Sequence, residues 1–336
     1  MRLELFTPDL ANRHEITHAI SCEFSYFYND IGKFTVVLPM DDYNIGISQL
    51  DAVLYIVERK LAFEVAEVQL DCDNNYITLN GYTLNNLLNR RVAATAATIS
   101  NVETDAYAAV SANLRGLPVQ LAAAKGLTEK VAATSVYGDS LLTLIQPVLS
   151  DAGLGQRATF DYRAKTITWE IYKGLDRSTG LSAVSFVQER GTAQGLVVDK
   201  DRSEYKNVCY CSAQYKDQTD FVVQAGTADG EARRELWAQF SGDAQGEDES
   251  NEAFQIRVKN YAALQLGSHL DRTGFETEID GDELGGAYDV GDLVWCVSLR
   301  LGVKFKARIT GATLAQDING SSTKIIIGNP MLTVLR

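Results

Sequence analysis

This chain of 336 residues has no apolar run long enough to cross a membrane, and it has little basic charge. A membrane-spanning helix needs about 20 consecutive apolar residues, and no stretch approaches that length. The N-terminal residues MRLELFTPDL contain no apolar signal core, so secretion by that route is not expected. Lysine and arginine total 31 against 44 aspartate and glutamate residues, a net charge of −13. Nucleic-acid readers carry the opposite balance, so no stable nucleic-acid binding is expected.

Cysteine and histidine are also scarce, which leaves little room for metal or disulfide chemistry. The five cysteines are scattered, and only Cys209 and Cys211 lie close together. Their spacing falls in an alternating strand pattern, and no second cysteine or histidine pair completes a zinc site. We therefore expect buried, reduced thiols, as in proteins made in a reducing cytoplasm. The patterns G-x-S-x-G and G-x-x-x-x-G-K-S/T are absent, and no cofactor is expected.

What the sequence does contain is the composition of a folded protein with several domains. The apolar fraction is 46% and the charged fraction 22%, which are ordinary values for globular proteins. Short β-branched and aromatic stretches separated by turn residues occupy both ends of the chain. Helical patterns lie between them. The predicted fold class is mainly β with α/β and helical insertions, an α+β protein of several domains.

Changes of pattern divide the chain into four parts. Residues 1–92 are expected to form a small β-barrel or sandwich. Residues 93–180 are expected to be an α/β insertion with two helices and a hairpin that turns at residues 163–165. Residues 181–230 and 286–336 are again β, and residues 231–285 are expected to be a helical insertion.

The second helix of the α/β insertion carries local start and stop signals. Asp139 is a candidate N-cap, and Gly153 is a candidate residue just beyond the C-terminus. Pro147 lies inside the helical pattern, where a proline is expected to kink the helix or end its regular part.

Residues 14–18 spell HEITH, the zinc-protease pattern. In that pattern two histidines one helical turn apart hold a metal and the glutamate acts as a base. Here apolar residues occupy the even positions from 16 to 26 apart from position 18, which indicates a half-buried strand. On a strand His14 and His18 would lie about 13 Å apart, too far for one zinc ion with bonds of about 2.1 Å. We predict that His14, Glu15 and His18 form no metal site and that the chain is not an enzyme.

Three tryptophans, Trp169, Trp237 and Trp295, are widely spaced along the chain. Packing in hydrophobic cores is the favoured interpretation for all three. A sugar-binding platform is the alternative.

Six stretches spread over the chain occur in an order and spacing typical of one family. They are IGKFTVVLP, LNGYTLNNLLNRRV, YKGLDRS, SEYKNVCYC, YDVGDLVWC and ARITGATLAQDINGSSTKIIIGN. The first resembles a G-x-F-x-x-x-L-P strand, and the last resembles a closing hairpin. In these features the chain resembles the tail hub proteins of siphophages and prophages, found at the tail tip. The residues that carry the matches are Gly32, Phe34, Pro39, Gly81, Asn207, Gly291 and Asp292.

The resemblance implies a structural protein with two β-barrel-like tube domains, residues 1–92 and residues 181–230 with 286–336, assembled as a homotrimer. Two similar barrels per subunit would give a pseudo-six-fold ring that lets DNA pass. The implied partners are the distal tail or tail tube protein, the tip fibre or spike, and the tape-measure protein. The implied location is the virion tail tip, after synthesis and assembly in the cytoplasm of the bacterial host.

The chain stops directly after the closing hairpin, whereas many relatives continue with a peptidase, a wall hydrolase or a fibre-like extension. A hub alone is therefore expected. Two alternatives stay open. One is a related hub from a contractile tail or injection device. The other is a host-surface binding or wall-degrading module, in which HEITH would resemble a metallopeptidase motif.

Overall fold

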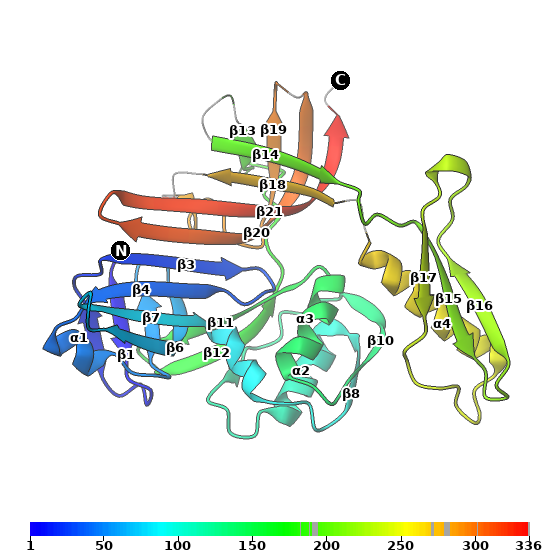
Figure 1. Cartoon of the computed structure of the whole chain (residues 1–336), viewed down its shortest axis with the longest axis horizontal. Coiled ribbons are helices and arrows are strands. Elements are labelled where there is room, and N and C mark those ends of the chain that lie inside the picture. Colours follow the sequence, from blue (N-terminus) through cyan, green and yellow to red (C-terminus); the bar gives the residue numbers. More distant parts are fainter. Residues whose placement is uncertain are drawn as a thin grey trace. The chain divides into compact units, whose positions relative to one another are not determined.

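The computed structural model describes residues 1–181, 183–187, 189, 194–269, 272–278, 283–300 and 302–334. The chain forms two compact units (Figure 1). Unit 1 comprises Met1–Val197 and Phe275–Arg336, and unit 2 comprises Val198–Gly274. Strands dominate both units, so the predicted mainly β fold is confirmed.

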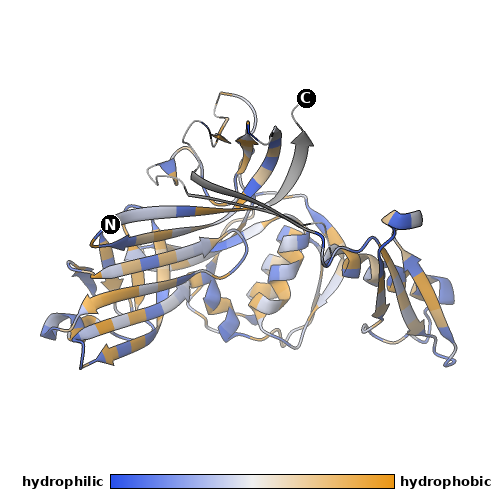
Figure 2. Cartoon of the chain, turned by 45° about the horizontal axis from the view of Figure 1, so that its top comes forward, coloured by the Kyte–Doolittle hydropathy of each residue, from blue (hydrophilic) through white to orange (hydrophobic). Residues whose placement is uncertain are grey.

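The N-terminal part of unit 1 is an antiparallel sheet with the strand order β3–β4–β7–β6–β5–β1–β2. Its strands are β1 (Leu3–Phe6), β2 (Arg13–Ile16), β3 (Ser21–Phe27), β4 (Lys33–Pro39), β5 (Val53–Ile56), β6 (Leu61–Asp71) and β7 (Tyr76–Thr83). The short helix α1 (Asp42–Ile47) follows β4, and a 3₁₀ helix (Leu84–Arg90) follows β7. Apolar and polar residues alternate along β3, β4 and β7 (Figure 2), as expected for strands with one buried face, whereas β1 and β5 are buried at every position.

The single strand predicted across HEITH is two strands. Residues 13–16 form β2, which pairs with β1, and residues 21–27 form β3, which pairs with β4. Residues 17–20 connect the two strands. In the N-terminal sheet β2 and β3 lie at opposite ends of the strand order. The alternation of the sequence continues across this connection, so a periodicity test alone could not detect the break.

The α/β insertion contains two helices and two small sheets, β10–β8 and β11–β12–β9. Its elements are β8 (Ala97–Asn101), α2 (Val102–Asn113), β9 (Gln120–Leu121), β10 (Lys130–Val136), α3 (Leu141–Asp151), β11 (Gly155–Asp161) and β12 (Thr166–Tyr172). The predicted hairpin is confirmed: β11 and β12 pair antiparallel around a turn in which Lys165 has a positive φ of 54°. Trp169 is fully buried in the core beneath these elements, as predicted.

Helix α3 differs from its predicted details in two ways. Ser140, not Asp139, is the N-cap, because the Ser140 side chain accepts a hydrogen bond from the Thr143 N–H. The helix also continues through Pro147 to Asp151. Proline cannot bond the carbonyl of residue 143, but Thr143 is exposed, so water can solvate that group. Gly153 follows the helix with a positive φ of 67°, in agreement with the predicted stop.

The C-terminal strands complete unit 1. They are β13 (Ser185–Val187), β14 (Gln194–Asp201), β18 (Arg272–Glu278), β19 (Leu293–Ser298), β20 (Val303–Asp317) and β21 (Gly320–Val334). The predicted closing hairpin is confirmed as β20 and β21, and β20 also pairs with β3 of the N-terminal sheet. In the described part of the chain the strand order is an open path from β14 to β2, so the two barrels stay a prediction.

Unit 2 is a three-stranded sheet with one long helix. Strand β15 (Val208–Gln214) lies between β16 (Asp220–Ala225) and β17 (Glu235–Gln239), and α4 (Asn251–Gly267) packs on them. Residues 208–225 were expected in a β domain and residues 231–285 in a separate helical insertion, whereas β15, β16, β17 and α4 share one core. None of the helices in the described ranges is long and apolar enough to cross a membrane.

The burial predicted for the cysteine thiols is found for most of them. Four cysteines are buried, including Cys209 and Cys211 on the α4-facing side of β15, and none forms a disulfide. Cys72 is the exception: it lies exposed in the turn between β6 and β7, so the expectation of burial is wrong there.

Candidate functional site

The HEITH residues do not lie on a helix. His14 and Glu15 belong to β2, where they stand opposite Leu5 and Glu4 of β1, and His18 lies in the segment after the strand. The Tyr43 hydroxyl of α1 donates a hydrogen bond to the Glu15 carbonyl oxygen. The two histidines therefore do not share a helix face, as the zinc-protease geometry requires. Within the described residues no cluster of three metal-binding side chains occurs.

Four family-motif residues lie at close contacts within the N-terminal sheet. Gly81 of β7 stands opposite Phe34 of β4, and a Cβ at Gly81 would lie 1.8 Å from the Glu64 carbonyl oxygen and 2.5 Å from the Phe34 ring. Phe34 packs against the Phe24 and Phe63 rings. The remaining two residues also have close partners: Gly32 lies against the Ser25 backbone, and the Pro39 carbonyl accepts a hydrogen bond from the Asn44 side chain.

Asn207, a further family-motif residue, lies just before β15 in unit 2. Its side-chain oxygen accepts a hydrogen bond from the Arg234 N–H at 2.8 Å, and its amide nitrogen donates to the Ala232 carbonyl at 2.8 Å. These two bonds join the start of β15 to the segment before β17. Asn207 therefore sets the start of the parallel pairing between β15 and β17.

Gly291 and Asp292 lie at the point where the N-terminal sheet, the α/β insertion and the C-terminal strands meet. Gly291 has a positive φ of 104°. A Cβ on Gly174, just after β12, would lie 1.8 Å from the Gly291 carbonyl oxygen. The Asp292 carboxylate accepts hydrogen bonds from the N–H groups of Leu175 and Asp289 at 2.8 and 3.1 Å. We call this meeting point the joint, and define it by Tyr28, Gly155, Tyr172, Gly174, Gly291, Asp292 and Arg308.

Two tyrosines fill the joint. The Tyr28 and Tyr172 rings meet edge to face with centroids 5.1 Å apart. The Tyr28 hydroxyl, from the end of the first sheet, donates to the Gly153 carbonyl at 3.1 Å. The Tyr172 hydroxyl, from the insertion, donates to the Val290 carbonyl at 3.3 Å. Each ring thus links one part of unit 1 to another. Tyr172 begins the family stretch YKGLDRS and Tyr28 lies in none of the six stretches, so only the folded chain shows that the two rings meet.

Arginines cover both rings of the joint. The Arg308 guanidinium lies 4.8 Å from the centroid of the Tyr28 ring and donates to the Gly291 carbonyl. The Arg157 guanidinium lies 4.6 Å from the centroid of the Tyr172 ring and is paired with Glu170 at 2.5 Å. A cation over an aromatic face is stabilising, more so when partly removed from water. The joint is therefore held by charge as well as by packing.

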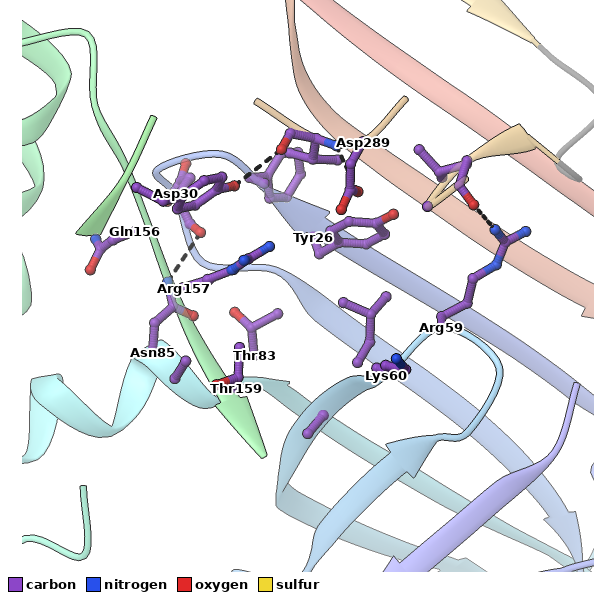
Figure 3. A pocket seen from close by; sticks show the side chains of 18 of the residues that line it. Tyr26, Asp30, Arg59, Lys60, Thr83, Asn85, Gln156, Arg157, Thr159 and Asp289 are labelled. Atoms are coloured by element: carbon purple, nitrogen blue, oxygen red, sulfur yellow. Dashed lines mark hydrogen bonds between the residues drawn. The ribbon is translucent and has the colours of Figure 1, made fainter. Parts of the chain in front are cut away.

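A cavity of about 490 Å³ opens beside the joint (Figure 3). Figure 3 shows Arg157 extending from β11 toward Tyr26, with Asp289 nearby, and Arg59 bonded to the Leu284 carbonyl. Burial, together with the nearby Asp289 carboxylate, raises the pKa of the Tyr26 hydroxyl. Burial also raises the pKa of Asp289 above its ordinary value of 3.8. The residues that line the cavity come from the N-terminal sheet, from the α/β insertion and from residues 284–290.

The half-buried carboxyl of Asp289 predicts a pH-dependent stability. Its folded-state pKa is raised, so the folded protein holds this proton more tightly, and the stability conferred by Asp289 falls as pH rises through the folded pKa. We expect Asp289→Asn to be more stable than the unmodified protein at about pH 7, with a difference that shrinks toward about pH 4. The measurement is the melting temperature across this pH range. Asp73→Asn, at an exposed position, is the control and should follow the unmodified protein. A destabilised Asp289→Asn with no pH trend would contradict the assignment.

The fold of the chain is shared with phage tail proteins. The tail protein from Neisseria meningitidis MC58 matches with a TM-score of 0.63 and 12% identity, over 98% of this chain and 97% of that one. The prophage MuSo2 43 kDa tail protein from Shewanella oneidensis matches with a TM-score of 0.62 and 11% identity, over 97% and 98%. The E. coli c3393 protein, a type VI secretion component described as similar to T4 bacteriophage tail proteins gp27 and gp5, matches with a TM-score of 0.50 and 14% identity, over 93% and 73%. At these identities the matches show the fold.

The sequence itself shows the family. The model of the family described as Siphovirus ReqiPepy6 Gp37-like protein matches residues 2–329. The chain belongs to this family of siphovirus tail proteins, and the family resemblance predicted from the sequence motifs is confirmed. Among curated proteins no match was found.

Proposed function

We propose that this protein is the hub of a siphophage tail tip, a homotrimeric ring that joins the tail tube to the tip fibre or spike. The observation that carries the proposal is the extent of the match: the family model covers residues 2–329, and the tail-protein fold covers nearly the whole chain. No part of unit 1 or unit 2 is left over as a separate catalytic domain, so the proposed role is structural and not enzymatic.

The connection from β2 to β3 supports a barrel-like first tube domain over residues 1–92. Six strand spacings separate β2 from β3 in the sheet order, which would amount to about 29 Å in a flat sheet. The chain from Ile16 to Ser21 can span at most about 18 Å. The sheet must therefore curl so that its two ends approach each other. We assign the C-terminal strands of residues 286–336 to the second tube domain, and the joint connects the two.

The charge of the chain suits a ring that passes DNA. A net charge of −13 offers DNA phosphates few cations that could replace their counterions, so DNA would pass without stable binding. The proposed partners are the distal tail or tail tube protein on one side and the fibre or spike on the other, with the tape-measure protein as a further contact. We place assembly in the cytoplasm of the bacterial host and the finished ring at the virion tail tip.

The decisive experiment measures the oligomeric state and shape of the purified chain. We expect a species with three times the subunit mass of 36.8 kDa in multi-angle light scattering. Electron microscopy of this species should show a three-fold ring with a central channel. A chain that stays monomeric at high concentration, alone and together with its distal tail protein, would overturn the hub proposal.

The alternative is a module that binds the host surface. One observation favours it: the indole of Trp237 is 65% exposed. The wall-degrading form of this alternative has no such support, because the HEITH residues lie on a strand and its connection.

A further inference from the structure

The sheet of unit 2 has one covered face and one open face (Figure 1). Helix α4 buries Phe254, Val258 and Ala262 against Cys209 and Cys211 of the central strand β15. Successive side chains of a strand point to opposite faces of its sheet. The residues between these buried positions therefore form the other face. They are Tyr210, Ser212 and Gln214 of β15, Asp220, Val222 and Gln224 of β16, and Glu235, Trp237 and Gln239 of β17.

Trp237 is the most prominent of these open-face residues. Its side chain is 65% exposed, whereas Trp169 is fully buried, so the expectation of core packing is wrong for Trp237. Trp237 and Gln224 stand on either side of Tyr210 in the register of the three strands. In the next row, Gln239 and Val222 stand on either side of Ser212. The open face thus carries two aromatic rings, three amides, a hydroxyl, a valine and the carboxylates of Asp220 and Glu235.

Tyr210 is held in place at the edge of Trp237. The Arg233 guanidinium lies 5.6 Å from the centroid of the Tyr210 ring and donates to its hydroxyl at 2.6 Å. Arg233 is itself paired with Glu235 at 2.5 Å. Because these contacts fix Tyr210, a ligand that packs on the face would not have to order this side chain, which lowers the cost of binding.

The geometry points to a binding site for a neutral, hexose-based oligosaccharide on this open face. A sugar ring presents a flat C–H surface that packs on an indole, and its rim of hydroxyls both donates and accepts hydrogen bonds. Trp237 supplies the flat apolar surface, and the side-chain amides of Gln224 and Gln239 supply a donor and an acceptor each. Within the face, Arg233 is matched by Glu235 and Asp220 adds a negative charge, so an anionic ligand is disfavoured.

The size of the face argues against a protein occupant. The outer strands lie about 10 Å apart, and three rows of same-face residues span about 13 Å. The face has nine residues, whereas a standard protein interface uses roughly 20–30 residues per partner. The length of about 13 Å matches two or three sugar rings. Interface cores also carry few Ser, Glu and Asp residues, and all three occur here.

The test uses the full chain and three probes: cellohexaose, chitohexaose and maltohexaose. Titration calorimetry should detect binding of at least one, and that sugar should protect tryptophan fluorescence from acrylamide quenching. Trp237→Ala should weaken binding about tenfold or more, because it removes the packing surface, and should abolish the protection. The matched control is Ile256→Ala, which removes another exposed apolar side chain of unit 2, 61% exposed on α4.

The possible results distinguish a sugar from a second subunit as the partner of the open face. Ile256→Ala should bind like the unmodified protein, and both variants should keep its melting temperature, because both side chains are exposed. If none of the three probes binds at millimolar concentration, or if Trp237→Ala binds as well as the unmodified protein, the site does not exist. If Trp237→Ala changes the oligomeric state and no probe binds, the face is a contact between subunits. The hub proposal survives each of these failures, because it rests on the match of the family and the fold over nearly the whole chain and not on a sugar site.

Discussion

Replacing Asp292 with alanine is expected to lower the free energy of unfolding by about 3–5 kcal/mol. The Asp292 side chain is only 6% exposed and is paired with Arg177 at 3.2 Å. Its carboxylate also accepts hydrogen bonds from the N–H groups of Leu175 and Asp289. Alanine leaves a largely buried guanidinium and two backbone donors without their acceptor, and removing one partner from such a network costs far more than the pair contributes. Asp292→Asn keeps an acceptor of the same shape and should lose less.

Two measurements check this prediction. Urea unfolding gives the loss of stability, and hydrogen exchange should show faster exchange at the Leu175 amide, which bonds directly to Asp292. Glu15→Gln is the control: Glu15 is exposed on β2, and a surface change of this kind stays within about 0.5 kcal/mol. A loss below about 1 kcal/mol for Asp292→Ala would show that the joint does not depend on this carboxylate.

The elements of the fold were predictable wherever a segment carries its own signal. The apolar spacing of α2 and α4, the turn at Lys165 and the closing hairpin β20–β21 all follow from local periodicity and turn residues. The break between β2 and β3 was not predictable, because it arises from the strand order of the sheet. The grouping of β15, β16 and β17 with α4 likewise depends on which faces meet, and the sequence pattern does not specify that.

The joint could be predicted only in part. Gly291 and Asp292 were identified because they resemble a family motif at the start of a strand. Tyr172 and Gly174 lie in the family stretch YKGLDRS and Tyr28 lies in none of the six stretches, but no local pattern specifies their partners, which lie more than 100 residues away in the chain. Trp237 was not predictable in either respect. It lies on β17, in a range that was expected to be a helical insertion, and whether its face is covered depends on the position of α4.

Replacing Gly81 with alanine is expected to destabilise the N-terminal sheet by about 3 kcal/mol or more. The added Cβ would lie 1.8 Å from the Glu64 carbonyl oxygen and 2.5 Å from the Phe34 ring. The first contact is with backbone, which cannot rotate away, and the second is with a ring packed against Phe24 and Phe63. Strands β6 and β7 would have to separate at their bulge, where Gly81 stands opposite Val65.

The matched control for Gly81 is Gly46→Ala in helix α1, where a Cβ would meet no atom within 4 Å. Alanine there should stabilise the helix by about 0.5–1 kcal/mol, because glycine loses more backbone freedom on folding. The same substitution is thus expected to lower the stability at Gly81 and to raise it at Gly46. Thermal unfolding of both variants measures this difference. Equal melting temperatures would mean that β6 and β7 do not approach each other at Gly81.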